Sequence, residues 1–254
     1  MEISNLEEFE SNEDQDKYVN EVVAHLDKTQ GKMIRSKLLI DTMEKTAVSH
    51  RMSLGNALPC AKIAMRGIEL IHNASIIHDD MLDNNSKRRG VASLHAEYGN
   101  NIALVTGDVL FARALTMLGK LNDGYVISHA LGVFRHMAEG QLAESAWASN
   151  KYTPQIEEII DVMRRKTGVL MGFSVRLGAY FVLKEQFSPE LVEDLDDIAK
   201  QGEYYGIAYQ IQDDIEDMDE DASNGTQTIP IIYGKERALQ IAEYFKHESA
   251  INLL

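Results

Sequence analysis

The sequence is poor in residues that break helices or cross-link a chain. Its 254 residues include four prolines and one cysteine, Cys60. A single cysteine excludes an internal disulfide and fits a reducing compartment, so we expect a cytoplasmic protein. Cys60 lies in an apolar helical stretch, and we expect it to be a small buried side chain.

Basic residues are also scarce. Lys and Arg number 25 against 40 Asp and Glu, which gives a net charge of −15 and argues against nucleic acid as a partner. Part of the acidic excess lies in residues 1–16, which contain no Lys or Arg and are expected to be solvated. We find no signal segment and no apolar run of membrane-spanning length, and so expect no stable membrane insertion.

Strand patterns are almost absent, because Val and Ile never alternate with polar residues for long. Apolar residues recur instead with the period of a helix. The stretches that show this period are 38–43, 61–74, 102–118, 126–146, 156–180 and 191–217. No linker divides them. The sequence therefore predicts one all-α domain over residues 1–254, a bundle of about ten or more helices around a central active-site cavity.

A group of acidic residues follows one of these apolar runs. Asp79 and Asp83 are four residues apart, so they share one face of a helix, with Asp80 beside them. Carboxylates at this spacing repel each other unless a cation lies between them. Mg²⁺ suits such a place, since it takes oxygen ligands and keeps waters and phosphate oxygens in its shell.

The same pattern returns far along the chain in Asp213, Asp214 and Asp217. A solvated acidic helix end would explain one copy. Each copy, however, follows an apolar run (68–77 and 207–211), where surface charge should be sparse. Two such copies therefore favour a divalent-metal site.

Further motifs occur in a fixed order around these two. They are Gly31-Lys32-Met33-Ile34-Arg35, His72, Arg88-Arg89-Gly90, Gly107-Asp108, residues 137–141 (Met-Ala-Glu-Gly-Gln) and Arg165-Lys166-Thr167. Together they resemble the trans-isoprenyl diphosphate synthases, also called the polyprenyl synthetase family, and most closely the bacterial long-chain enzymes. The resemblance implies an all-α fold, a homodimer, and Mg²⁺-dependent head-to-tail condensation of isopentenyl diphosphate with an allylic diphosphate.

The resemblance also implies roles for single residues. It implies three Mg²⁺ ions between the two acidic motifs, and we expect Asp79, Asp83 and Asp213 to be direct ligands. Asp217 belongs to the same metal site, and with Asp80 and Asp214 it is expected to orient waters. The residues implied for isopentenyl diphosphate are Lys32, Arg35, His72 and Arg89. Those implied for the allylic diphosphate or the cation are Arg88, Lys166, Thr167 and Gln210, with Lys166 counted among the catalytic groups. A lone His72 would be interpreted as a core histidine.

Product length should depend on the helix before Asp79. Ala74 and Ser75, about one turn before Asp79, are small, and Ile71 lies about one turn before them. A helical turn rises about 5.4 Å, and an isoprene unit spans roughly 5 Å, so each open turn admits about one more unit. We expect a product of geranylgeranyl length or longer.

The sequence departs from the family pattern in several places. Gln30 and Ser36 replace a glycine and a proline, and the stretch 218–228 is about half the expected length, with Thr226 in place of a lysine. The chain also stops at Leu254, so that helices at the C-terminus are expected to be missing. Two alternatives stay open: a non-catalytic subunit of a heteromeric synthase, and a class I terpene cyclase, which has a different second metal motif.

Overall fold

The computed structural model describes Val22, Ala24, His25 and the ranges 31–186, 188–219, 222 and 226–251. The acidic run 1–16, Gln30, Leu254 and parts of the stretch 218–228 lie outside the described residues. The helices are α2 (Ile34–His50), α3 (Ala57–Leu82), α4 (Leu94–Tyr98), α5 (Asn100–Gly119), α6 (Gly124–Asn150), α7 (Ile156–Met163), α8 (Val169–Leu183), α9 (Pro189–Glu216), α11 (Ile229–Tyr233) and α12 (Lys235–Glu248). A π-helical turn, η1 (Arg164–Gly168), a 3₁₀ turn, η2 (Lys184–Gln186), and strands β1 (Lys87–Arg88) and β2 (Val91–Ala92) complete the described elements.

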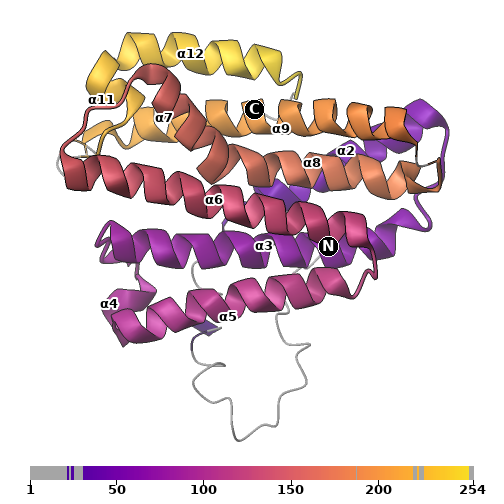
Figure 1. Cartoon of the computed structure of the whole chain (residues 1–254), viewed down its shortest axis with the longest axis horizontal. Helices are drawn as coiled ribbons and strands as arrows, with labels where there is room; N and C mark the ends of the chain where they lie inside the picture. The colour runs from indigo at the N-terminus through magenta and orange to yellow at the C-terminus, as the bar shows by residue number, and fades with distance from the viewer. Residues whose placement is uncertain are drawn as a thin grey trace, which may run out of the picture. The chain divides into compact units, whose positions relative to one another are not determined.

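The all-α class is confirmed, since each predicted helical stretch lies in a helix (Figure 1). Three details differ from expectation. The stretch 156–180 is two α-helices joined through η1, a short antiparallel hairpin lies between α3 and α4, and Cys60 is half-buried rather than buried. The central cavity stays a prediction.

The described residues fall into two compact units, each made of separate chain segments. The first unit combines the described residues up to Ile34 with Glu69–Ala114. The second combines Arg35–Ile68 with the described residues from Leu115 onward. The boundaries fall inside α3 and α5, so both helices contribute to both units.

Helix α8 is the core of the second unit, because every residue of it except Arg176 is buried. Its neighbour α9 approaches it through glycines (Figure 1). A Cβ on Gly206 would lie 2.7 Å from Gly168 Cα, and one on Gly202 would lie 2.8 Å from Gly172 Cα. Real side-chain atoms do not fit at these distances, so the two backbones are in direct contact.

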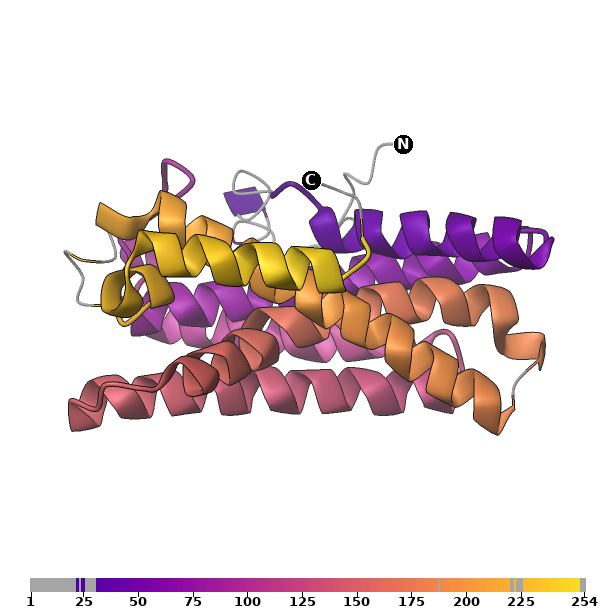
Figure 2. The same ribbon diagram turned by 90° about the horizontal axis from the view of Figure 1, so that it is seen from above.

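Another face of α9 carries Ile207, Ile211 and Ile215, at the four-residue spacing of a helical stripe. This stripe packs in one cluster with Phe245 of α12 and Met163 of α7. Figure 2, which is turned by 90° from Figure 1, shows α12 running along α9 from a second side. Helix α9 is thus fixed by glycine contacts to α8 and by apolar packing against α12.

In the first unit, the second half of α3 runs beside α5 (Figure 1). The His78 ring fills the space between them: its Nε2 lies 3.1 Å from the Leu104 carbonyl oxygen, and a Cβ on Gly107 would lie 2.2 Å from the same nitrogen. The predicted glycine of the Gly107-Asp108 pair therefore makes room for the residue that precedes Asp79.

Helix α5 corrects one expectation. Among the described residues it is the one helix whose length and apolar composition would let it cross a membrane, with a third of it buried. This is weak evidence of a span, since the core helix of a soluble protein passes the same test. Its exposed residues include Ile102, Val105 and Val109.

A polar cluster joins α6, α8 and α9. Arg176 donates to the Tyr125 hydroxyl (3.0 Å) and to His129 Nε2 (3.1 Å), and it pairs with Asp196 at 2.5 Å. Because a guanidinium cannot accept, His129 Nε2 must be the acceptor, so the proton is assigned to Nδ1, which donates to the Tyr125 carbonyl (2.8 Å). Burial, and then the charge of Arg176, lower the pKa of His129.

Protonation of His129 should therefore lower the free energy of unfolding. Its pKa is lower in the folded than in the unfolded state, so stability is full above pH 6.5 and falls as the pH drops below that value. We expect the free energy of unfolding, measured with urea, to decrease less between pH 7 and pH 5 in His129→Gln than in the wild type. The control is His247→Gln, at a side chain 89% exposed; an equal decrease in both variants would contradict the assignment.

The glycine contact predicts the effect of one added methyl group. Gly206→Ala should lower the free energy of unfolding by about 1–3 kcal/mol, because the Gly168 backbone cannot move aside as a side chain can. Gly132→Ala in α6 is the matched control, since nothing lies within 4 Å of its added Cβ. That change should leave stability equal or raise it by up to about 1 kcal/mol. Equal effects at both glycines would disprove the close contact.

Candidate active site

The first acidic motif lies at the C-terminal end of α3, in the first unit. Asp79 is half-buried, Asp80 is 3% exposed, and Asp83 is exposed in the turn that follows the helix. The buried Asp80 faces Arg88, whose Nη2 lies 2.5 Å and whose Nε lies 3.0 Å from Asp80 Oδ1. The outer two carboxylates are therefore the accessible ones.

The hairpin β1–β2 presents Arg88 to this motif. Arg88 pairs with Val91, so the loop has two residues, Arg89 and Gly90, with φ of 51° and 81°. Two positive φ values are typical of the tight turn that matches strand twist. Burial works to lower the pKa of Arg88, but the hydrogen bonds and charge of Asp80 raise it above its ordinary value. Arg88, predicted to contact the allylic diphosphate, is thus bound to the first acidic motif in this structure.

Arg89 reaches in another direction. A Cβ on Gly31 would lie 2.7 Å from Arg89 Nη2, so the guanidinium rests on the glycine that precedes Lys32. Arg89 is thereby placed beside the segment that carries Lys32, the other residue of the first unit that is predicted for isopentenyl diphosphate and lies outside α3. His72 is half-buried on α3 in the same unit, and Arg35 is half-buried at the start of α2 in the second.

The second acidic motif ends α9, in the second unit. Asp213 is half-buried, Asp214 is 7% exposed, and Asp217 is the exposed residue that caps the helix. Gln210 Nε2 donates to Asp214 Oδ1 at 2.8 Å, and Gln210 Oε1 accepts from Thr167 Oγ1 at 3.0 Å. The predicted residues Thr167 and Gln210 are therefore joined in one chain of hydrogen bonds to the second acidic motif.

Lys166 and Thr167 both lie in the π turn η1, where helical hydrogen bonds span one extra residue. Thr167 turns toward α9, while Lys166 forms an ion pair with Glu144 of α6. Gln141 Nε2 donates to the same carboxylate at 3.3 Å, and Gln141 Oε1 is buried without a hydrogen-bond partner. The turn thus sends consecutive side chains to two different helices.

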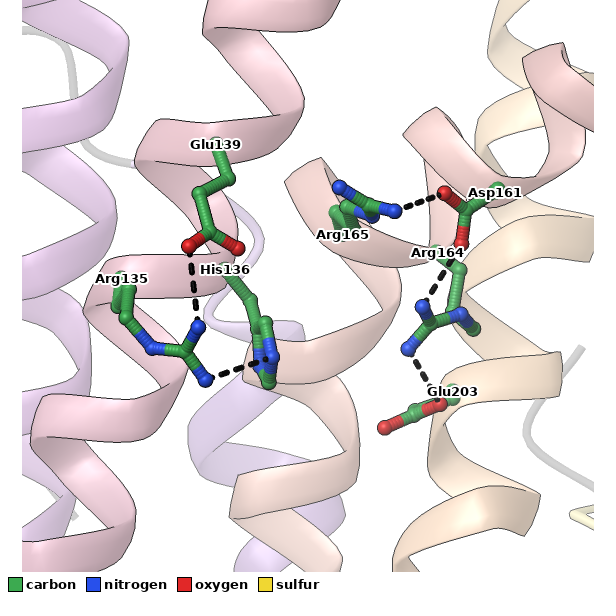
Figure 3. Close-up of polar contacts among 7 residues, drawn as sticks. All are labelled: Arg135, His136, Glu139, Asp161, Arg164, Arg165 and Glu203. Carbon is green, nitrogen blue, oxygen red and sulfur yellow. Dashed lines mark hydrogen bonds and ion pairs between the residues drawn. The ribbon is translucent and has the colours of Figure 1, made fainter.

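The two arginines before Lys166 share the carboxylate of Asp161 (Figure 3). Arg164 lies 2.7 Å and Arg165 lies 2.6 Å from the Asp161 carboxylate, and Arg164 also lies 3.7 Å from Glu203 of α9. Burial works to raise the pKa of Asp161, but hydrogen bonds from both arginines lower it below its usual value. These pairs fix the start of the π turn.

Sequence reasoning gave no role to Glu144, Gln141 or Asp161. Gln141 closes one of the quoted motifs, and Glu144 follows it by three residues, on the same face of the helix. That spacing was the available signal. The partner of Glu144, 22 residues away, could be found only from the fold.

The carboxylates of the two acidic motifs suit a cation that takes its other ligands from water and a bound substrate. In the part of the chain that the structure describes, no three His, Cys, Asp or Glu side chains form a metal-binding group. Each motif instead offers two accessible carboxylates, Asp79 with Asp83 and Asp213 with Asp217. Mg²⁺ commonly binds through one or two carboxylates, with waters and substrate phosphates as its other ligands. These four residues are therefore suitable Mg²⁺ ligands.

The predicted chain-length residues lie on α3 before the first motif. Ala74 and Ile71 are buried at 0% and 1% exposure. Ser75 is half-buried, and its hydroxyl donates to the His72 carbonyl at 2.9 Å. None of the three is a large side chain, and their role in chain length stays a prediction.

A family model described as Polyprenyl synthetase matches residues 16–238. The chain belongs to the polyprenyl synthetase family. This match, which covers most of the chain, confirms the resemblance drawn from the motifs.

Similar proteins include members with different products. The chain is 32% identical over 216 residues to the short chain isoprenyl diphosphate synthase of Methanocaldococcus jannaschii (84% of this chain, 61% of that protein). It is 34% identical over 177 residues to the nonaprenyl diphosphate synthase of Mycobacterium tuberculosis (65% and 50%). A solved structure of a geranyltranstransferase from Thermotoga maritima matches with a TM-score of 0.72 at 27% identity (87% of this chain, 77% of that chain). The chain thus spans about half to three fifths of the length of these two curated relatives.

The hairpin contact yields a prediction about the stability of this family member. Arg88→Ala leaves the buried Asp80 without its charged partner and should lower the free energy of unfolding by about 1–3 kcal/mol. The double variant with Asp80→Ala should lose less than the sum of the two single changes. Urea denaturation measures both. Lys87→Ala, at an exposed position of the same strand, is the control; additive losses would show that the pair is not coupled.

Proposed function

We propose that this polyprenyl synthetase condenses isopentenyl diphosphate with an allylic diphosphate in a Mg²⁺-dependent reaction. The observation that supports this most is the like construction of the two acidic motifs. In each, the middle aspartate is buried and hydrogen-bonded by the protein, while the outer two are accessible. Two acidic helix ends serving only as solvated surface would not bury a carboxylate.

The reaction breaks the allylic carbon–oxygen bond, and diphosphate leaves with the electron pair. Bound Mg²⁺ would neutralise the charge that develops on this leaving group. Asp79, Asp83, Asp213 and Asp217 are the residues proposed to hold it, with three ions as the family resemblance implies. Lys166 adds a positive charge for the same oxygens, since an ammonium offers three donors.

The second substrate needs its own anion pocket. The Arg89 guanidinium lies against Gly31, which precedes Lys32 in the chain, and a guanidinium with an ammonium suits a diphosphate. The double bond of isopentenyl diphosphate attacks the allylic carbon, and a proton is then lost from the new product. No side chain described here is an evident base, so we assign that proton to the released diphosphate.

We propose a product of geranylgeranyl length or longer. Ala74 is small, and the next turn toward the start of α3 carries Ile71, which is an aliphatic side chain and not a large plug. The relatives do not fix the length, because their names include both short-chain and nonaprenyl synthases. The two alternatives, a non-catalytic subunit and a terpene cyclase, have no structural observation in their favour.

The activity is tested with the purified protein, labelled isopentenyl diphosphate and an allylic primer, with and without Mg²⁺. Asp79→Ala and Asp213→Ala should each lower kcat by about 10²–10³-fold, since each removes a ligand worth several kcal/mol in the transition state. Glu216→Gln, an exposed carboxylate next to Asp217, should change little. No consumption by the wild type would refute the function, and a single C15 product would refute only the length.

We also propose a homodimer that pairs through α5. Ile102, Val105 and Val109 are 37–58% exposed and lie on neighbouring turns of one apolar helix. An exposed apolar stripe of this kind marks an interaction surface. Val105→Glu should shift the mass in solution, measured by light scattering, from two chains to one. Lys120→Glu, an exposed change just beyond the helix, is the control; a monomeric wild type would contradict the proposal.

A further inference from the structure

The basic run of the π turn divides its side chains between near and distant carboxylates. Arg164 and Arg165 pair with Asp161, three and four residues earlier (Figure 3). Lys166 pairs instead with Glu144 of α6, 22 residues earlier. The ammonium that we assign to diphosphate binding is therefore paired with a carboxylate of another helix.

The stem of Lys166 is confined as well. A Cβ on Gly140 would lie 3.1 Å from Lys166 Cγ and 3.2 Å from its backbone nitrogen. Helix α6 thus comes close to the side chain one turn before Glu144, and the Lys166 side chain is 22% exposed. A flexible lysine is in this way held at both its stem and its charged end.

Glu144 is itself oriented, because Gln141 donates to the carboxylate oxygen that faces Lys166. A lysine ammonium has three donors and no acceptor. Glu144 accepts from one of these three donors and so fixes the direction of the ammonium. Part of the ordering cost of a mobile lysine is then met before the ligand arrives.

We propose that Glu144 is a positioning residue for diphosphate binding, acting through Lys166. This rests on the proposed function, which makes Lys166 a diphosphate ligand. The charge of the Glu144 carboxylate opposes this effect, since it repels a polyanion. The Lys166 side chain is 22% exposed and the Glu144 side chain 37%, so solvent and salt weaken that repulsion. We therefore expect the ordering of Lys166 to outweigh the repulsion, so that Glu144 strengthens diphosphate binding.

The test measures binding of inorganic pyrophosphate in the presence of Mg²⁺ by titration calorimetry. Glu144→Ala should raise Kd about tenfold, which corresponds to about 1.4 kcal/mol. Glu144→Asp, which keeps the charge, should return Kd to within about threefold of the wild type. Glu139→Gln removes a carboxylate from the same helix that pairs with Arg135, and should leave Kd unchanged. Glu144→Gln, nearly isosteric, replaces the alanine variant if circular dichroism shows that the latter is unfolded.

A double-variant cycle tests whether Glu144 acts through Lys166. Lys166→Ala should weaken pyrophosphate binding, and adding Glu144→Ala to it should weaken binding no further. In turnover, Glu144→Ala should raise KM for the allylic diphosphate and leave KM for isopentenyl diphosphate unchanged. A general packing defect would raise both.

The outcomes separate the two proposals. If the wild type binds pyrophosphate and Glu144→Ala binds it equally or more tightly, the positioning role is wrong and the proposed function stands. The role is also wrong if Glu144→Ala weakens binding by the same factor in the Lys166→Ala background. If the wild type binds no pyrophosphate with Mg²⁺, both proposals fail.

Discussion

The direct contact between two helix backbones, α8 with its π turn and α9, determines where the second half of the candidate site lies. Gly206 lies against the Gly168 backbone and Gly202 lies against the Gly172 backbone, so the two helices approach each other closely at these glycines. The hydrogen bond from Thr167 to Gln210 lies one turn beyond this contact. Larger residues at the glycines would push α9 away and break that bond. The position of the second acidic motif therefore depends on glycines that have no reactive group.

The two acidic motifs stabilise their middle aspartates with different partners. Three carboxylates at a helix end repel one another, and the protein neutralises or bonds the middle one before any metal binds. Arg88 does this for Asp80 with a full charge, and Gln210 does it for Asp214 with an amide. The first arrangement brings a hairpin to the motif, and the second brings a neighbouring helix. The outer aspartates are left accessible in both.

Much of this was predictable from the sequence. The helical period gave the all-α class, and the acidic pairs with the ordered motifs gave the family. The partners of the middle aspartates were not predictable, because Arg88 approaches Asp80 only through a turn with positive φ at Arg89. The pair of Glu144 with Lys166 likewise depends on how α6 and the π turn pack together. The π turn itself was not predictable from hydrophobic spacing, because its residues, Arg164–Gly168, are mostly polar and carry no apolar period.

The π turn makes the length of this segment as important as its composition. A π turn fits one extra residue into nearly the same rotation as an α-helical turn, so removing one residue from Arg164–Gly168 would restore an ordinary helix and leave the residues after it on nearly the same faces. The approach of Gly172 to α9 would then survive. The directions of Lys166 and Thr167 would change, although these two side chains now reach α6 and α9. The extra residue is therefore needed to aim these two side chains and not to hold the helices together.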